Sequence, residues 1–362
     1  MQITRADAIR LKIPFTDPGA GTGLFQGTWT AHDFVLLRLE TDTGLTAWGE
    51  AFSYFCAGAV HAMVADAVCP LLIGRDGTDM DRILAEMRHK LHLVGRYGIT
   101  MFAISAADIA LHDLAAKAAG VSLAEHLGGR RHAALPAYAS LIRYGDPDLV
   151  RRMAAQAAGE GYPMIKLHEI ELSAIRAGRE GAGDRALTND VNCNWSADQT
   201  RAMAPALQDL DLMWLEEPIF PPEDFETLAQ VRNDTGLAIA SGENLCTAHQ
   251  FAQMTAMGGA DYVQPSVTKI GGIAETLATR KDAAAKRLRV AHHAPYFGPG
   301  LLATLQILAA AEAEEYVEWL YVEREADLFP AMPKPQGGRI AVPDGPGLGL
   351  DPDPDVLLRY AV

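Results

Sequence analysis

The chain has 362 residues, of which 49% are hydrophobic and 21% are charged, and its formal net charge is −15. This length exceeds what one simple hydrophobic core usually holds, so we expect two domains, or a barrel with an added cap. The negative charge argues against nucleic acid or an anionic membrane as a partner. An anionic substrate would need a local positive charge, which a bound divalent cation supplies.

The cysteines and the N-terminus indicate the compartment. The four cysteines are Cys56, Cys69, Cys193 and Cys246, and none forms a Cys-x-x-Cys pair, which is typical of a reduced cytoplasmic protein. The first residues lack the apolar core of a signal peptide. No segment reaches the roughly 18 uninterrupted apolar residues of a spanning helix. We therefore expect a cytoplasmic protein without a membrane partner.

Residues 1–130 predict an α+β capping domain. Residues 34–40 and 45–49 are apolar runs on either side of the turn 41–44, as in an antiparallel hairpin. Three helical stretches follow, near 60–73, 79–94 and 100–119. Strands followed by a run of helices, rather than by alternation, indicate an α+β arrangement.

Residues 131–335 predict a (β/α) barrel of the TIM type. Strand ends are expected near residues 140, 168, 192, 216, 243, 266, 293 and 318, with helices such as 147–158, 273–285 and 302–313 between them. Eight such units are enough to close a barrel. The Gly- and Pro-rich segment 336–362 is too short for a domain, and we expect it to return to the cap and complete it.

Three carboxylates stand at nearly equal steps along the barrel sequence. Asp190, Glu216 and Glu243 are separated by 26 and then 27 residues, about the length of one β/α unit. The C-termini of barrel strands converge on one mouth, so the three acids should meet there. Three hard oxygen donors predict one Mg²⁺ ion. In the alternative interpretation each acid only caps the helix that follows, which is common for a single junction.

Basic residues are expected at the same mouth. Lys166 and His168 alternate on the strand before Asp190, so both side chains can face the barrel interior. His292 and His293 end the seventh strand, and at most one of two adjacent residues can point at the barrel axis. A solvated lysine and a structural histidine are the alternatives.

These ordered motifs resemble the enolase superfamily, and within it the mandelate racemase and muconate-lactonizing enzyme group. The resemblance covers essentially the whole chain and includes the cap, residues 96–129, the three metal-ligand motifs, residues 269–272 and the tail 343–350. It implies that Asp190, Glu216 and Glu243 bind Mg²⁺ and that the proton beside a substrate carboxylate is removed to form an enediolate. A lysine or histidine base beside Mg²⁺ is typical of such sites.

The resemblance also implies roles around the mouth. The acid and base candidates are Lys166, His168 and His293. The residues expected around the substrate are Asn192, Lys269, Glu318, Ser266, Tyr144 and Tyr296. Two cap loops, 15–30 and 52–56, are expected to close over the mouth and choose the substrate.

Two departures from the family pattern affect the expected reaction. Histidine, His168, stands where many relatives have a second lysine, and Ser266 stands where they have Asp or Lys. A carboxylate there would orient and charge His293, whereas serine can only orient it. The incomplete pair disfavours a two-base racemase. We therefore expect dehydration of a hydroxy or sugar acid, with proton removal from the side of Lys166 and His168 and with His293 as the acid.

Other functions stay open on the sequence alone. They are a racemase, epimerase or cycloisomerase of a hydroxy- or amino-acid derivative, and a non-catalytic metal-binding barrel. A Schiff-base lyase using Lys166 would fit the barrel but would leave the three acids unexplained. The expected partner is a small-molecule carboxylate, and we expect the protein to be a homo-oligomer.

Overall fold

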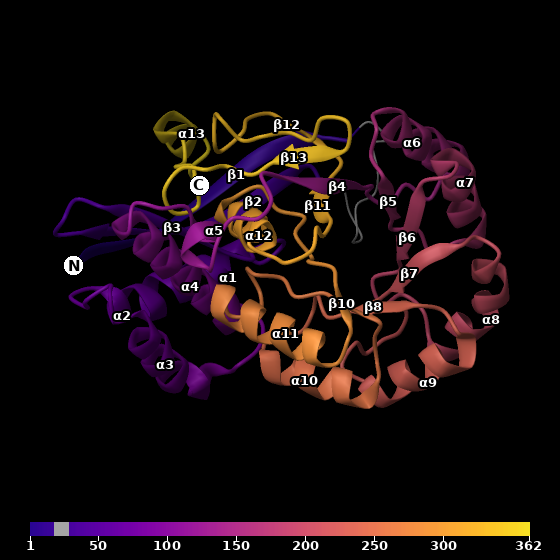
Figure 1. Ribbon diagram of the computed structural model, residues 1–362, viewed down its shortest axis with the longest axis horizontal. Coiled ribbons are helices and arrows are strands. Elements are labelled where there is room, and N and C mark those ends of the chain that lie inside the picture. The colour runs from indigo at the N-terminus through magenta and orange to yellow at the C-terminus, as the bar shows by residue number, and fades with distance from the viewer. Residues whose placement is uncertain (18–28) are drawn as a thin grey trace.

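A computed structural model describes residues 1–17 and 29–362. Most of the predicted cap loop 15–30 therefore lies outside the described residues. Figure 1 shows the cap strands and helices on one side of the molecule and a ring of helices around parallel strands on the other. The predicted fold class, a (β/α) barrel with an α+β cap, is confirmed.

The cap contains a four-stranded antiparallel sheet in the order β12-β1-β2-β3. Its strands are β1 (Ile3–Thr16), β2 (Ala31–Thr41), β3 (Thr46–Ala51) and β12 (Glu323–Arg324). The predicted hairpin is present as β2 and β3, with Val35 opposite Ala51. Residues 35–37 and 39 of β2 are fully buried, because the strand packs on both faces.

Helices cover this sheet, mostly where the periodicity predicts them. They are α1 (Ala57–Ala62), the π-helical turn η1 (Met63–Val68), α2 (Cys69–Leu72), α3 (Met80–Leu91), the short turn η2 (His92–Val94), α4 (Ile99–Ala118) and α5 (Leu123–His126). Among the described residues, α4 is the one helix long and apolar enough to cross a membrane, but 89% of its most apolar window is buried inside the protein. It packs closely on β3, since a Cβ at Gly49 would lie 1.9 Å from the backbone oxygen of Ala106.

The barrel strands are parallel neighbours in the order β10-β9-β8-β7-β6-β5-β4-β11. Their bounds are β4 (Ala134–Ser140), β5 (Met164–Leu167), β6 (Ala186–Asp190), β7 (Leu212–Glu216), β8 (Ile239–Ser241), β9 (Tyr262–Val263), β10 (Arg289–Val290) and β11 (Val317–Leu320). Each strand ends within about three residues of its predicted end. Most residues of these strands are buried, with β10 as the exception, because helices cover the outer face and side chains fill the inside.

The helices that surround the barrel alternate with its strands (Figure 1). They are α6 (Pro147–Gly159), α7 (Leu172–Ala182), α8 (Ala197–Gln208), α9 (Phe225–Thr235), α10 (Ala248–Met257), α11 (Ile273–Ala285) and α12 (Pro299–Ala309). The last begins earlier than the predicted 302–313, because Pro299 is well suited to the first turn of a helix, and it ends at Ala309.

The C-terminal segment contacts both parts of the molecule. Strand β13 (Arg339–Ala341) pairs with barrel strand β4. Further on, Ala361 forms a bridge with Leu11 of cap strand β1, and the last helix, α13 (Pro354–Arg359), lies beside that strand in Figure 1. The predicted domain limits near residues 130 and 335 stay predictions.

Buried carboxylates of the cap accept hydrogen bonds from backbone amides outside it. Glu50 Oε2 accepts from the amide of Gly300 at 2.8 Å, Asp108 Oδ1 from that of Ile273 at 2.6 Å, and Asp113 Oδ1 from Leu348 at 2.8 Å. The first two amides begin α12 and α11, where helical N–H groups lack partners within the helix. These contacts hold the cap over the barrel mouth.

Candidate active site

Three acids converge at the mouth of the barrel. Asp190 and Glu216 end adjacent strands and are paired in register, and Glu243 follows β8 by two residues. Ligand oxygens of the three carboxylates all lie within 4.8 Å of one another. Burial raises the pKa of Asp190 to about 6 and that of Glu216 to about 8, and it also raises the pKa of Glu243. Bringing the three acids together without a cation is therefore unfavourable.

The donor set fits a hard divalent cation. Three carboxylates without sulfur or imidazole ligands are the type of oxygen set that Mg²⁺ prefers. Oδ2 of Asp190 is buried and lies 3.1 Å from Nζ of Lys166; a carboxylate oxygen has more than one lone pair, so this oxygen can also bind a cation. Trp214 holds one oxygen of Glu216 in place, since its Nε1 donates to Oε2 at 2.9 Å.

Lys166 reaches into this group of acids. Its Nζ lies 2.5 Å from Glu216 Oε1, 3.1 Å from Asp190 Oδ2 and 3.4 Å from Glu318 Oε1. Burial opposes its charge, but the surrounding carboxylates outweigh burial and raise the pKa of Lys166 well above its usual value. The side chain is 1% exposed. Its positive charge therefore lies beneath the barrel mouth, out of contact with solvent.

His168 stands beside Lys166, as strand alternation predicts. Its Nδ1 is hydrogen-bonded to the backbone carbonyl of Leu141, and its Nε2 lies 3.5 Å from Asp190 Oδ2. A carbonyl can only accept, so Nδ1 carries the proton and Nε2 keeps its lone pair. Burial and the neighbouring Lys166 charge lower the pKa of His168. The arrangement is that of a neutral imidazole whose bare nitrogen faces the mouth.

His293 lies at the other side of the triad. Its Nε2 is 3.3 Å from Glu243 Oε2, while its buried Nδ1 has no hydrogen-bond partner within residues 1–17 and 29–362. Burial lowers the pKa of His293. The adjacent His292 turns away instead, with its Nε2 2.9 Å from Nη1 of Arg280. Of the two adjacent histidines, only His293 therefore faces the barrel mouth, as expected from strand alternation.

Ser266 contacts Tyr296 in the structure. The Ser266 hydroxyl lies 3.5 Å from the hydroxyl of Tyr296, and Tyr296 in turn donates to the backbone oxygen of His293 at 2.9 Å. The serine thus contacts a tyrosine that holds the His293 backbone, not the imidazole.

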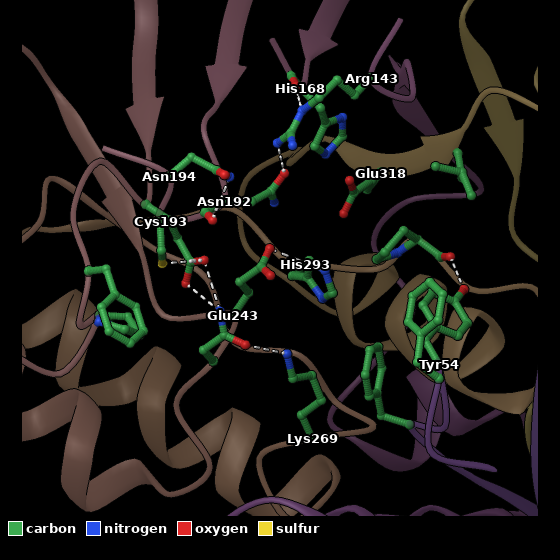
Figure 2. A pocket seen from close by; sticks show the side chains of 18 of the residues that line it. Tyr54, Arg143, His168, Asn192, Cys193, Asn194, Glu243, Lys269, His293 and Glu318 are labelled. Atoms are coloured by element: carbon green, nitrogen blue, oxygen red, sulfur yellow. Dashed lines mark hydrogen bonds and ion pairs between the residues drawn. The ribbon is translucent and has the colours of Figure 1, made fainter. Parts of the chain in front are cut away.

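A cavity of about 1000 Å³ opens over these groups. Figure 2 shows His168 and Arg143 on one side, His293 and Lys269 on another, and Glu243 and Glu318 between them. Of the residues predicted around the mouth, those that line the cavity are His168, Asn192, Glu243, Lys269, His293 and Glu318. Lys166, Asp190 and Glu216 are buried beneath them.

The predicted substrate contacts of Tyr144, Tyr296 and Ser266 are not supported. All three are buried and none lines the cavity. The Tyr144 hydroxyl lies 3.2 Å from Asp17 Oδ1, and the Tyr296 hydroxyl donates to the backbone oxygen of His293. The three side chains lie behind the cavity wall, and their hydroxyls contact other groups of the protein.

Polar side chains along the wall are linked to one another. Arg143 donates from Nε to the carbonyl of His168 at 2.6 Å and from Nη2 to Asn192 Oδ1 at 3.0 Å. On the other side, Lys269 Nζ donates to Asn244 Oδ1 at 3.0 Å, and Asn244 Nδ2 donates to Glu217. These bonds fix the positions of the polar groups around the triad.

Sequence reasoning missed Cys193 and Phe220, which both line the cavity. Cys193 has a φ of +57° in the turn after β6, and its thiol donates to Glu217 Oε2. Phe220 lies in the loop after β7 and is 74% exposed. Their position just beyond strand ends was the available signal, since barrel sites are built from the βα loops.

Comparison with known proteins supports this geometry. Residues 148–356 match the enolase C-terminal domain-like family, and residues 20–128 match the N-terminal domain of mandelate racemase and muconate lactonizing enzyme. A 3,6-anhydro-α-L-galactonate cycloisomerase of Streptomyces coelicolor is 30% identical, with 99% of this chain and 98% of that protein covered. An L-talarate/galactarate dehydratase of Salmonella typhimurium is also 30% identical, with 94% and 85% covered.

A solved structure agrees as well. The mandelate racemase/muconate lactonizing protein of Paracoccus denitrificans PD1222, in complex with magnesium, superposes with a TM-score of 0.87 at 26% identity, over 100% of this chain and 98% of that one. The same family is indicated by both domain matches, by the relatives that align over nearly the whole chain and by the converging acids. The chain belongs to the mandelate racemase and muconate lactonizing enzyme group of the enolase superfamily.

Proposed function

We propose that this protein removes the proton α to the carboxylate of a small sugar acid and then expels an oxygen from the β-carbon. The observation that carries the proposal is the placement of two imidazoles on either side of the acidic triad. Nε2 of His168 lies 3.5 Å from Asp190 and Nε2 of His293 lies 3.3 Å from Glu243, and both rings line one cavity. A substrate between them would meet a base on one side and an acid on the other.

His168 is the base in this proposal. Its Nδ1 is committed to the Leu141 carbonyl, so the lone pair of Nε2 faces the cavity. Lys166 contributes positive charge from beneath, which stabilises the second negative charge that the substrate carboxylate gathers as its α-proton leaves. Asp190, Glu216 and Glu243 would hold Mg²⁺, which supplies further positive charge beside that carboxylate.

His293 is the acid. Unlike His168, whose Nδ1 proton is held by a carbonyl, His293 has no partner for Nδ1 among the described residues, whereas its Nε2 lies 3.3 Å from a carboxylate oxygen; this favours a proton on Nε2. The α C–H electron pair becomes the new C=C bond, the β C–O bond breaks, and the leaving oxygen takes its proton from His293. If that oxygen is a free hydroxyl, water is lost and the reaction is a dehydration. If it is a ring oxygen, the ring opens and the reaction is an isomerisation.

Hydrogen exchange in deuterated water tests these roles. His168→Asn should abolish exchange of the substrate α-proton, whereas His293→Asn should keep exchange and stop product formation. The matched control is His292→Asn, because the ring of His292 faces Arg280 outside the cavity; it should retain both. Loss of exchange in His293→Asn would make His293 the base and reverse the assignment. Absence of exchange with every acid tested would favour a non-catalytic barrel.

Metal identity and assembly need separate measurements. Glu216→Gln should weaken Mg²⁺ binding in isothermal titration calorimetry and leave the circular dichroism spectrum unchanged. We further propose a homo-oligomer in the cytoplasm, which sedimentation velocity and cell fractionation test.

A further inference from the structure

Aromatic side chains of the cap form one wall of the cavity. This aromatic wall consists of Trp29, Phe52, Tyr54 and Phe55, all of which line the cavity. The rings support one another, with centroids 5.0 Å apart for Trp29 and Tyr54 and 4.9 Å apart for Phe52 and Tyr54. The wall is therefore preorganised before any substrate enters.

The wall offers ring faces more than hydrogen bonds. The Tyr54 hydroxyl donates to the backbone carbonyl of Pro295, which Figure 2 shows as a dashed line, so it is not free for substrate hydroxyls. Leu320, Pro295 and Pro222 add further apolar surface to the same cavity. A flat apolar face on the substrate would gain from burial here, whereas substrate hydroxyls placed against these rings would lose water without a partner on the wall.

Charge in the cavity disfavours a second carboxylate on the substrate. Four acids line it, namely Glu217, Glu223, Glu243 and Glu318. Of the described lining residues only Arg143 and Lys269 are cationic, and each already donates to neighbouring protein oxygens. Residues 18–28 contain no lysine, arginine or histidine, so they add no cation. One substrate carboxylate would be matched by a cation held by the acidic triad and by Lys166, but a distant second one would face acids.

We propose that the substrate is a sugar acid with one carboxylate whose remaining carbons are closed into a ring, such as a lactone or a cyclic ether. The inference rests on the function proposed above and narrows its substrate class. The ring places an apolar face on the aromatic wall and presents its oxygen at the β-carbon to His293. The overall reaction is then ring opening without loss of water, an isomerisation.

Four probes separate ring closure from charge. They are 3,6-anhydro-L-galactonate and D-galactarolactone, which carry a ring and one carboxylate, D-galactonate, which is open with one, and galactarate, which is open with two. Each is tested with other stereoisomers of the same type. We expect the best ring-bearing acid to exceed the best open monoacid in kcat/KM by about tenfold or more, and open diacids to be poorest.

The outcomes distinguish the two proposals. If an open-chain monoacid or diacid has the highest kcat/KM, the proposal of a ring-bearing monoacid substrate is overturned, while the proposed function stays in place. If no acid of any type exchanges its α-proton, the proposed function fails, and this inference fails with it.

Variants at Tyr54 test the wall directly. Tyr54→Leu should raise KM for ring-bearing acids about tenfold, with a smaller effect on kcat and on open-chain acids. Tyr54→Phe restores the ring without the hydroxyl and should return KM toward the wild-type value. Equal losses for ring-bearing and open-chain acids in Tyr54→Leu would show a merely structural role and overturn the wall as the selective element.

Discussion

Glu50 provides a quantitative test of how the cap is held on the barrel. The side chain is 3% exposed and its Oε2 accepts from the amide of Gly300 at the start of α12. Burial raises its pKa from 4.5 to about 8, although the Gly300 amide opposes this shift. Between these two pH values the folded protein holds a proton that the unfolded chain has released. Stability is therefore lost as pH rises through this window.

The expected size follows from the shift. Each pH unit inside the window removes about 1.4 kcal/mol from the free energy of unfolding, or about 5 kcal/mol over the whole window. Glu50→Gln keeps the shape of the neutral acid and does not titrate. Its free energy of unfolding should therefore rise relative to that of the wild type by about 1.4 kcal/mol per pH unit.

Urea unfolding followed by circular dichroism at pH 5.5, 6.5 and 7.5, at constant ionic strength, measures this difference. Glu125→Gln, a change at an exposed acid of cap helix α5, is the control and should run parallel to the wild type. Parallel profiles for Glu50→Gln and the wild type would refute the argument, because they would mean that Glu50 has the same pKa in both states.

Three further changes follow from other contacts. Trp214→Phe removes the indole donor to Glu216 and should weaken Mg²⁺ binding about tenfold in calorimetry; an unchanged affinity would mean that the carboxylate is held by other contacts. Asp108→Ala leaves two amides at the start of α11 without their acceptor and should lower the free energy of unfolding by about 1–3 kcal/mol in urea. Gly49→Ala would place a Cβ 1.9 Å from a backbone oxygen of α4 and should cost about 3 kcal/mol or more, whereas Gly159→Ala, with nothing within 4 Å, should cost little; equal melting temperatures for the two would contradict the close packing.

The position of the acids along the chain could be predicted because barrel repeats are local. A strand, its loop and its return helix fix how far apart equivalent positions lie, so the 26- and 27-residue steps already placed Asp190, Glu216 and Glu243 at one mouth. Strand alternation likewise put Lys166 and His168 on one side. Both inferences need only the chain between neighbouring strands.

What the tertiary structure alone decided depends on contacts between distant segments. Ser266 contacts the hydroxyl of Tyr296, thirty residues further along the chain, and Tyr296 contacts the backbone of His293. The aromatic wall faces the barrel because the cap folds over it, so that Tyr54 meets the carbonyl of Pro295, 241 residues further along. No periodicity in a sequence records such docking, since it results from how two separately patterned surfaces pack. The sequence by itself therefore determined the barrel and its acids, and the packing of the cap determined the surface that meets the rest of the substrate.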